Sequence, residues 1–192
     1  MGIPTRIKTL TASGSDYLDF VDGTASVVFD DTYAEYMFVC TDINPATDNT
    51  DFSFQVNATD DAGGAFDANG GTTSLITSTA FVASHDEADT EVNSVEYDTG
   101  GDLAQSANFQ VLCRDCGNGA DESGAYILHI FNPSSTTYVK HFYATAHYMH
   151  YSSWARTQYT AGYINDTTPI DEIRFKFSSG AFDGVIQMYG IA

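Results

Sequence analysis

The sequence is poor in basic residues. It has 26 Asp and Glu but only 7 Lys and Arg, which gives a formal net charge of −19. The basic residues are scattered along the chain: Arg6, Lys8, Arg114, Lys140, Arg156, Arg174 and Lys176. Because a nucleic-acid duplex or an anionic bilayer is bound by clustered Lys and Arg, we expect neither nucleic acid nor membrane as a partner. The charge favours solubility and suits a basic protein partner or divalent cations.

Long apolar runs are also missing, and cysteines are few. No stretch approaches the roughly 20 apolar residues of a membrane-spanning helix. The first eight residues, Met1–Lys8, lack the apolar segment of a signal peptide. The 3 cysteines are an odd number, which argues against a secreted disulfide framework. We therefore expect a protein that is made and folded in the cytoplasm.

Aromatic residues and two-residue periodicity dominate what is present. Phe and Tyr number 13 and 12, and such residues suit a pleated, half-buried surface. Apolar and polar residues alternate most clearly in 51–57 and 172–177, where Phe52, Phe54 and Val56 would share one face. Further strands are expected in the other apolar runs, which are Ala34–Ile43, Thr73–Ala83, Phe109–Cys113, Ala125–Phe131, Tyr138–His147, Gln158–Ile164 and Val185–Ile191.

About ten short strands separated by Gly, Asn, Asp, Ser and Pro turns predict an all-β fold. We expect a single-domain β-sandwich over residues 13–192, with Greek-key or jelly-roll connections. Residues 1–12 would form an N-terminal arm or a first strand. The patch Tyr148–Arg156 would be a loop or a single turn. Two long loops are expected, at Gly63–Gly71 and at the acidic stretch Ser84–Gln105.

The cysteines and histidines were considered as chemical sites. Cys113 and Cys116 form a CxxC, which would suit a redox pair or half of a zinc site. No second ligand pair lies nearby in the sequence, so we favour two reduced cysteines at a turn, with Cys40 in the core. His141 and His147 share one face of a predicted strand but would lie about 20 Å apart, too far for one metal ion.

The acidic residues give no ordered pattern either. Adjacent carboxylates at 30–31, 60–61, 86–87 and 121–122 could serve glycoside hydrolysis only at a suitable separation, which sequence does not provide. Calcium binding by an acidic loop stays an alternative, although no Asp-x-Asp-x-Asp-Gly spacing occurs. No nucleophile elbow or phosphate-binding loop is present. We therefore expect no enzyme, no catalytic residue, and no cofactor or metal site.

Several motifs, taken in order, resemble a known family. They are Tyr36–Val39, Ile43–Asp48, Asn132–Phe142, Ala161–Tyr163, Ile170–Gly180 and Tyr189–Ile191. Together they resemble virion structural proteins of tailed bacteriophages, common in marine and freshwater phages including cyanophages. The resemblance covers most of the chain, from about Tyr33 to Ile191, and the Cys113/Cys116 pair is not part of it.

The resemblance implies a capsid cement, or decoration, protein. It would bind the major capsid protein on the outer surface of the virion, as a homotrimer, and stabilise the head. A tail or fibre component that contacts the host and a carbohydrate-binding β-sandwich module are the alternatives; Trp154 and Tyr151 would be the aromatic platforms of the latter. Candidate interface residues fall in two groups, an N-terminal arm and an aromatic stretch: Ile3, Pro4, Arg6 and Lys8, and His141, Tyr143, His147, Tyr148, Tyr151 and Trp154.

Overall fold

The structure, a computed structural model, describes residues 2–61, 74–90 and 93–192. The expected loop at Gly63–Gly71 lies outside these residues. The strands are β1 (Thr5–Ser15), β2 (Leu18–Val21), β3 (Glu35–Pro45), β4 (Thr50–Ala58), β5 (Ile76–Asp86), β6 (Asn93–Tyr97), β7 (Gln110–Cys116), β8 (Gly124–Phe131), β9 (Lys140–His150), β10 (Trp154–Ile164), β11 (Ile170–Phe177) and β12 (Phe182–Ile191). The described residues contain no helix long and apolar enough to cross a membrane.

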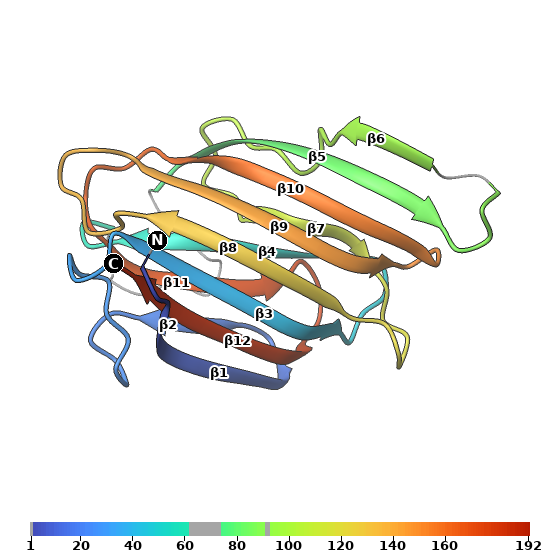
Figure 1. Cartoon of the computed structure of the whole chain (residues 1–192), viewed down its shortest axis with the longest axis horizontal. Helices are drawn as coiled ribbons and strands as arrows, with labels where there is room; N and C mark the ends of the chain where they lie inside the picture. The colour runs from blue at the N-terminus through green and yellow to red at the C-terminus, as the bar shows by residue number, and fades with distance from the viewer. Residues whose placement is uncertain (1, 62–73, 91–92) are drawn as a thin grey trace.

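The strands are all antiparallel and form two layers of unequal width (Figure 1). The larger layer runs β1-β12-β3-β8-β9-β10-β5-β6, and the smaller layer runs β7-β4-β11-β2. The layers meet along one side through the pairing of Cys116 in β7 with His150 in β9. The all-β, sandwich-like fold that the sequence predicted is therefore confirmed.

Successive strands change layer repeatedly. β1, β3, β8 and β12 are neighbours in the larger layer, whereas β2, β4, β7 and β11 make up the smaller one. The hairpins β5–β6 and β9–β10 widen the larger layer on one side. We interpret this order as a jelly roll with two added hairpins, and the jelly-roll class stays an interpretation of the strand order.

The apolar runs that predicted strands all coincide with strands of the structure, but two predicted loops also contain strand residues. The patch 148–156 is the end of β9, a three-residue turn and the start of β10, so it extends a hairpin instead of interrupting one. The stretch 84–105 contains the end of β5 and all of β6. Its remainder returns along β5, because Asp98 N–H donates to Ala80 O over 2.9 Å and Ser78 N–H donates to Leu103 O over 2.9 Å.

The core between the layers is built from aromatic rings. Phe52 of β4 lies at its centre, with its ring centroid 5.0 Å from Phe177, 5.1 Å from Tyr126, 5.6 Å from Phe182 and 6.1 Å from Phe175. These five side chains come from four strands of both layers, and all are buried. Contacts of this kind add to the burial of apolar area, so the centre of the core holds the two layers together.

The strand β4 is more deeply buried than its alternating sequence predicted. Phe52, Phe54 and Val56 face the core as expected, but Gln55 on the other face is also fully buried. The amide of Gln55 donates to Ala107 O and Asn108 O over 3.0 and 2.9 Å, so the segment before β7 covers this face. The polar residue Gln55 is therefore buried and hydrogen-bonded, and is not exposed to water as the alternating pattern predicted.

We predict that Phe52→Ala lowers the free energy of unfolding by about 3–5 kcal/mol, because it leaves a cavity among four rings. Val95→Ala is the control, since this β6 side chain is 74% exposed and its loss should change stability by less than about 0.5 kcal/mol. Urea denaturation of both variants measures the difference. Equal losses in the two variants would contradict the assignment of Phe52 to the centre of the core.

Candidate functional site

The outer face of the larger layer carries exposed aromatic side chains. In β9, Phe142 and Ala144 point into the core while His141, Tyr143 and His147 point outward, as their shared parity predicted. Neighbouring strands present side chains on the same side. The most exposed rings and the exposed aliphatic side chain of the central strands are Tyr97 (55%), Phe81 (46%), Tyr143 (42%), Tyr159 (39%) and Ile127 (38%). These fractions are high for rings and aliphatic chains in the middle of a sheet, and contiguous exposure of this kind marks an interaction site.

The pairing register places these side chains in two adjacent rows across the strands. The first row, from β6 to β12, is Tyr97, Phe81, Tyr159, Thr145, Ile127, Val39 and Gln187. The second row, from β5 to β12, is Thr79, Ala161, Tyr143, His129, Met37 and Tyr189. Neither row contains a carboxylate or a Lys or Arg, although the chain carries a net charge of −19. We call the side chains of these two rows the uncharged face.

Ring stacking fixes the side chains of the uncharged face. The rings of Phe81 and Tyr159 are stacked at 4.9 Å, and those of His129 and Tyr143 at 4.4 Å. A shallow hollow of about 210 Å³ lies between them, over Ala161. Two acidic groups border the face: Glu35 of β3 is held against the imidazole of His129, and Asp102 accepts the hydroxyl of Tyr97. The face is therefore preorganised, which lowers the entropy cost of binding a partner.

The other candidate interface residues lie elsewhere. Tyr148 points inward and is only 5% exposed, and its hydroxyl accepts the N–H of Arg114 over 3.1 Å. Tyr151 is exposed in the β9–β10 turn, and Trp154 is half-buried against the ring of His150. The aromatic stretch predicted from sequence is thus divided between the outer face, the core and a turn.

The N-terminal candidates lie at the opposite edge of the larger layer. Ile3 and Pro4 are exposed ahead of β1, whereas Arg6 and Lys8 belong to β1, which pairs with β12. Within the described residues, Arg6 and Lys8 have no ion-pair partner. The strands β12, β3 and β8 separate this edge from β9, so the structure does not bring the two candidate groups together.

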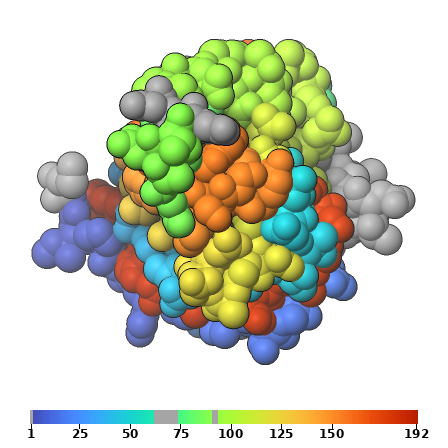
Figure 2. Space-filling model, turned by 90° about the vertical axis from the view of Figure 1, so that its right-hand side faces the viewer, coloured from blue at the N-terminus to red at the C-terminus, as the bar shows by residue number. Residues whose placement is uncertain are grey.

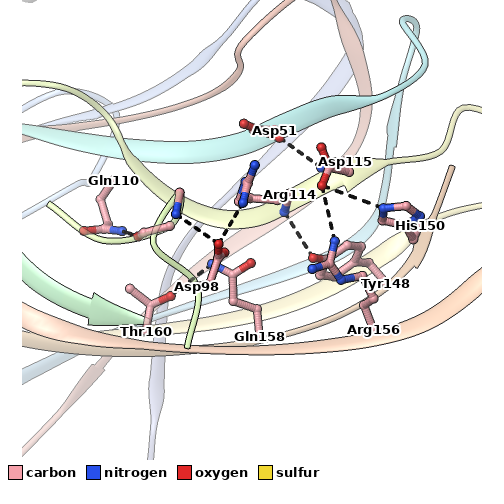
Figure 3. Close-up of polar contacts among 12 residues, drawn as sticks. Asp51, Asp98, Gln110, Arg114, Asp115, Tyr148, His150, Arg156, Gln158 and Thr160 are labelled. Carbon is pink, nitrogen blue, oxygen red and sulfur yellow. Dashed lines mark hydrogen bonds and ion pairs between the residues drawn. The ribbon is translucent and has the colours of Figure 1, made fainter. Parts of the chain in front are cut away.

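Beneath the uncharged face, a network of charged groups joins the layers (Figure 3). Arg114 of β7 donates to Asp98 over 2.7 Å, and Arg156 of β10 lies 3.3 Å from the carboxylate of Asp115. His150 Nε2 faces the same carboxylate over 3.7 Å. The charged groups thus pair across β7, β9, β10 and the segment after β6, which we call the polar clamp.

The ring of His150 is fixed and uncharged in the polar clamp. Its Nδ1 accepts the N–H of Ser152 over 3.1 Å, and Trp154 stacks on it at 4.3 Å. Burial and the neighbouring Arg156 lower the pKa of His150 to about 4, although Asp115 opposes the shift. At neutral pH the ring is therefore an uncharged polar group that packs between the two layers.

The CxxC motif lies within β7 and not at the turn that the sequence predicted. Asp115 between the cysteines has a φ of +58°, and the pairing with β4 shifts register here. This bulge turns both Cys113 and Cys116 into the core, where Cys113 Sγ lies 3.3 Å from the hydroxyl of Tyr126. Burial raises the pKa of Cys116 well above its usual range. The cysteines are free, and Cys116 is held as a thiol and not as a reactive thiolate.

The acidic groups are used in local contacts. Asp86 accepts the backbone N–H and the hydroxyl of Thr90, and Asp102 accepts the hydroxyl of Tyr97 over 2.6 Å. Across residues 2–61, 74–90 and 93–192, no three His, Cys, Asp or Glu side chains are grouped as metal ligands. His141, His147 and His150 are likewise split between the two sides of β9.

Comparison with protein families and with curated proteins finds no family model and no curated sequence that matches the chain.

We predict that Arg114→Met destabilises the protein by about 3 kcal/mol, because the Asp98 carboxylate, 5% exposed, loses its counter-charge. The double variant Arg114→Met with Asp98→Asn should regain part of this loss, since a neutral amide needs no counter-charge. Arg6→Met, at an unpaired surface cation, is the control. Chemical denaturation measures the free energy of unfolding of all three variants. If Arg114→Met were as stable as the wild type, the clamp role of Arg114 would be contradicted.

We predict that stability falls between pH 6.5 and pH 4 because of His150. In the unfolded chain the imidazole has an ordinary pKa near 6.5 and takes up a proton in this range, whereas the folded chain does not until about pH 4. The loss attributable to this ring should be about 2–3 kcal/mol. His150→Phe keeps the stacking and should remove that part of the pH dependence, while His147→Phe on the outer face should retain it. Denaturation at pH 7, 5.5 and 4 compares the slopes.

Proposed function

We propose that the chain is a non-enzymatic virion structural protein, a capsid decoration protein that docks on the outer surface of the head through its uncharged face. The resemblance to tailed-phage virion proteins suggests the assembly, and the uncharged face suggests the contact. The proposal that this face is the docking surface rests on one observation: two rows of side chains contain no charged residue, although the protein has a net charge of −19.

The composition of the uncharged face fits the centre of a protein interface. Such centres are enriched in Tyr, Phe and Met and depleted in Lys, Glu and Asp. Phe81, Tyr143, Tyr159 and Met37 supply the first kind, and the second kind is missing from both rows. A docked partner would thus desolvate rings and aliphatic chains without burying an unpaired carboxylate, which would cost several kcal/mol.

The width of the uncharged face also fits a protein–protein contact. The strands from β6 to β3 are six neighbours, and at the usual spacing they span about 24 Å. That width suits the centre of a protein–protein contact, which buries about 800 Å² on each partner. The acidic residues elsewhere keep unassembled copies soluble and repel other anions.

The N-terminal edge would make a second contact. Arg6 and Lys8 lie on the edge strand β1, and Ile3 is 88% exposed beside them. A cationic edge strand on an anionic protein suits an acidic segment of a neighbouring subunit. We propose the homotrimer as the assembled form, with the major capsid protein as the partner.

We predict hundreds of copies of the chain in each purified particle of the phage that encodes it. A decoration protein covers a repeating lattice, so quantitative gel densitometry against the major capsid protein measures the ratio. A handful of copies per particle would overturn the decoration role and favour the tail or fibre alternative.

The docking surface is tested on particles assembled without the chain. Tyr143→Ser combined with Tyr159→Ser should lower binding of the added protein at least about tenfold, since exposed rings at the centre of a contact carry most of its energy. The matched control combines Tyr17→Ser with Tyr138→Ser, two exposed tyrosines outside the uncharged face. Equal binding by the two double variants would contradict docking through this face.

A further inference from the structure

A second hollow lies at the end of the larger layer, where β8 ends and β9 begins. It encloses about 800 Å³ between the segment before β3 and the β8–β9 connection, at the left in Figure 1. Four rings line it, those of Tyr33, Phe131, Tyr138 and His141, and Tyr138 is 75% exposed. The volume lies within the range of small-molecule sites.

The walls of this hollow are rigid. Ser135 Oγ accepts the N–H groups of Thr137 and Tyr138 over 3.2 and 3.0 Å, which fixes the backbone that carries the exposed ring. Asn132 N–H donates to Ala34 O over 2.8 Å and joins the two walls. Tyr33 packs edge-on against the buried ring of Tyr36 at 5.8 Å. The hollow is therefore formed before any ligand arrives.

The polar groups of the hollow are free to bind. Asp31, Asn132, Ser134 and Thr137 line it, and within the described part of the chain none of their side chains makes a hydrogen bond. They offer hydroxyl, amide and carboxylate groups beside the ring of Tyr138. A pyranose ring presents C–H groups on its faces and hydroxyl groups around its rim, so it matches an aromatic ring flanked by such polar groups.

We propose that this hollow binds a neutral saccharide, with Tyr138 stacking on a sugar face and Asn132, Thr137 and Asp31 binding its hydroxyl groups. An anionic ligand fits less well, because no Lys or Arg lines the hollow, the imidazole of His141 is its one ring nitrogen group, and Asp31 would repel an anion. A peptide could not bind here by adding a strand, because β8 already pairs with β3 and β9, and β9 pairs with β8 and β10. The site does not depend on the proposed capsid role.

The test is an array of neutral, sialylated and sulfated oligosaccharides probed with the full chain, followed by calorimetric titration of the neutral oligosaccharide bound best. Tyr138→Ala should weaken its affinity at least about tenfold, and Thr137→Val, which replaces a hydroxyl by a methyl group, should weaken it several-fold. Tyr17→Ala removes an exposed ring outside the hollow and should leave the affinity unchanged.

Thermal melting and near-ultraviolet circular dichroism establish that each variant is folded. The proposal would be overturned if the array showed no binding of any neutral saccharide, or binding of charged saccharides alone. Equal affinities of Tyr138→Ala and the wild type would also overturn it. Because Tyr138→Ser belongs to the control in the particle-binding experiment, loss of saccharide binding with particle binding intact separates this site from the docking face.

Discussion

The structure depends on the packing of two layers of unequal width around Phe52. The smaller layer lies opposite one part of the larger one, and the aromatic rings of both fill the space between them. The hairpins that hold β5 and β10 extend the larger layer on the side where it meets β7. There the inward side chains change from rings and aliphatic chains, such as Phe38 and Leu128, to Gln158 and Thr160. The polar clamp is the consequence of this geometry.

The polar clamp replaces apolar packing with directed contacts. Arg114 and Arg156 come from different layers, and each is paired with a carboxylate. Gly101 lies so close to the clamp that an added Cβ would be 2.6 Å from Asp98 Oδ2, which shows how tightly the segment after β6 is fitted. Figure 2 shows the end of the molecule that is at the right in Figure 1, where the orange β9–β10 turn lies beside the yellow segment between β7 and β8. Buried ion pairs add little stability over apolar packing, but removal of one partner is costly, so the clamp specifies one arrangement of the layers.

The strands with a clear apolar run were predictable, whereas the exposed strand β6 and the four-residue strand β2 were missed. The apolar content of runs such as 125–131 and 185–191 predicts that they are buried strands. The described side chains of β6 are all exposed, so no burial pattern marks that strand. Leu18–Val21 was too short to stand out, although Phe20 is fully buried and Asp19 binds Arg174 through two contacts of 2.7 Å. Local composition cannot reveal contacts between residues 155 positions apart.

The candidate face was predictable only in part, for the same reason. The parity of His141, Tyr143 and His147 was readable within one strand. The rows were not, because they join Phe81, Tyr159 and Ile127 through a pairing order that alternation does not encode. The hollow beside Tyr138 is harder still, since it joins the segment before β3 to the β8–β9 connection.

The distribution of charge gives the uncharged face its physical meaning. A protein of net charge −19 repels its own copies, and salt screens that repulsion beyond a Debye length of about 8 Å under physiological conditions. Close contact is therefore tolerated best where no carboxylate has to be desolvated. The two rows on the larger layer meet that condition, and the stacking of Phe81 on Tyr159 and of His129 on Tyr143 keeps their rings in place. Acidity elsewhere would therefore disfavour contacts between like-charged copies outside this face and the cationic edge strand β1.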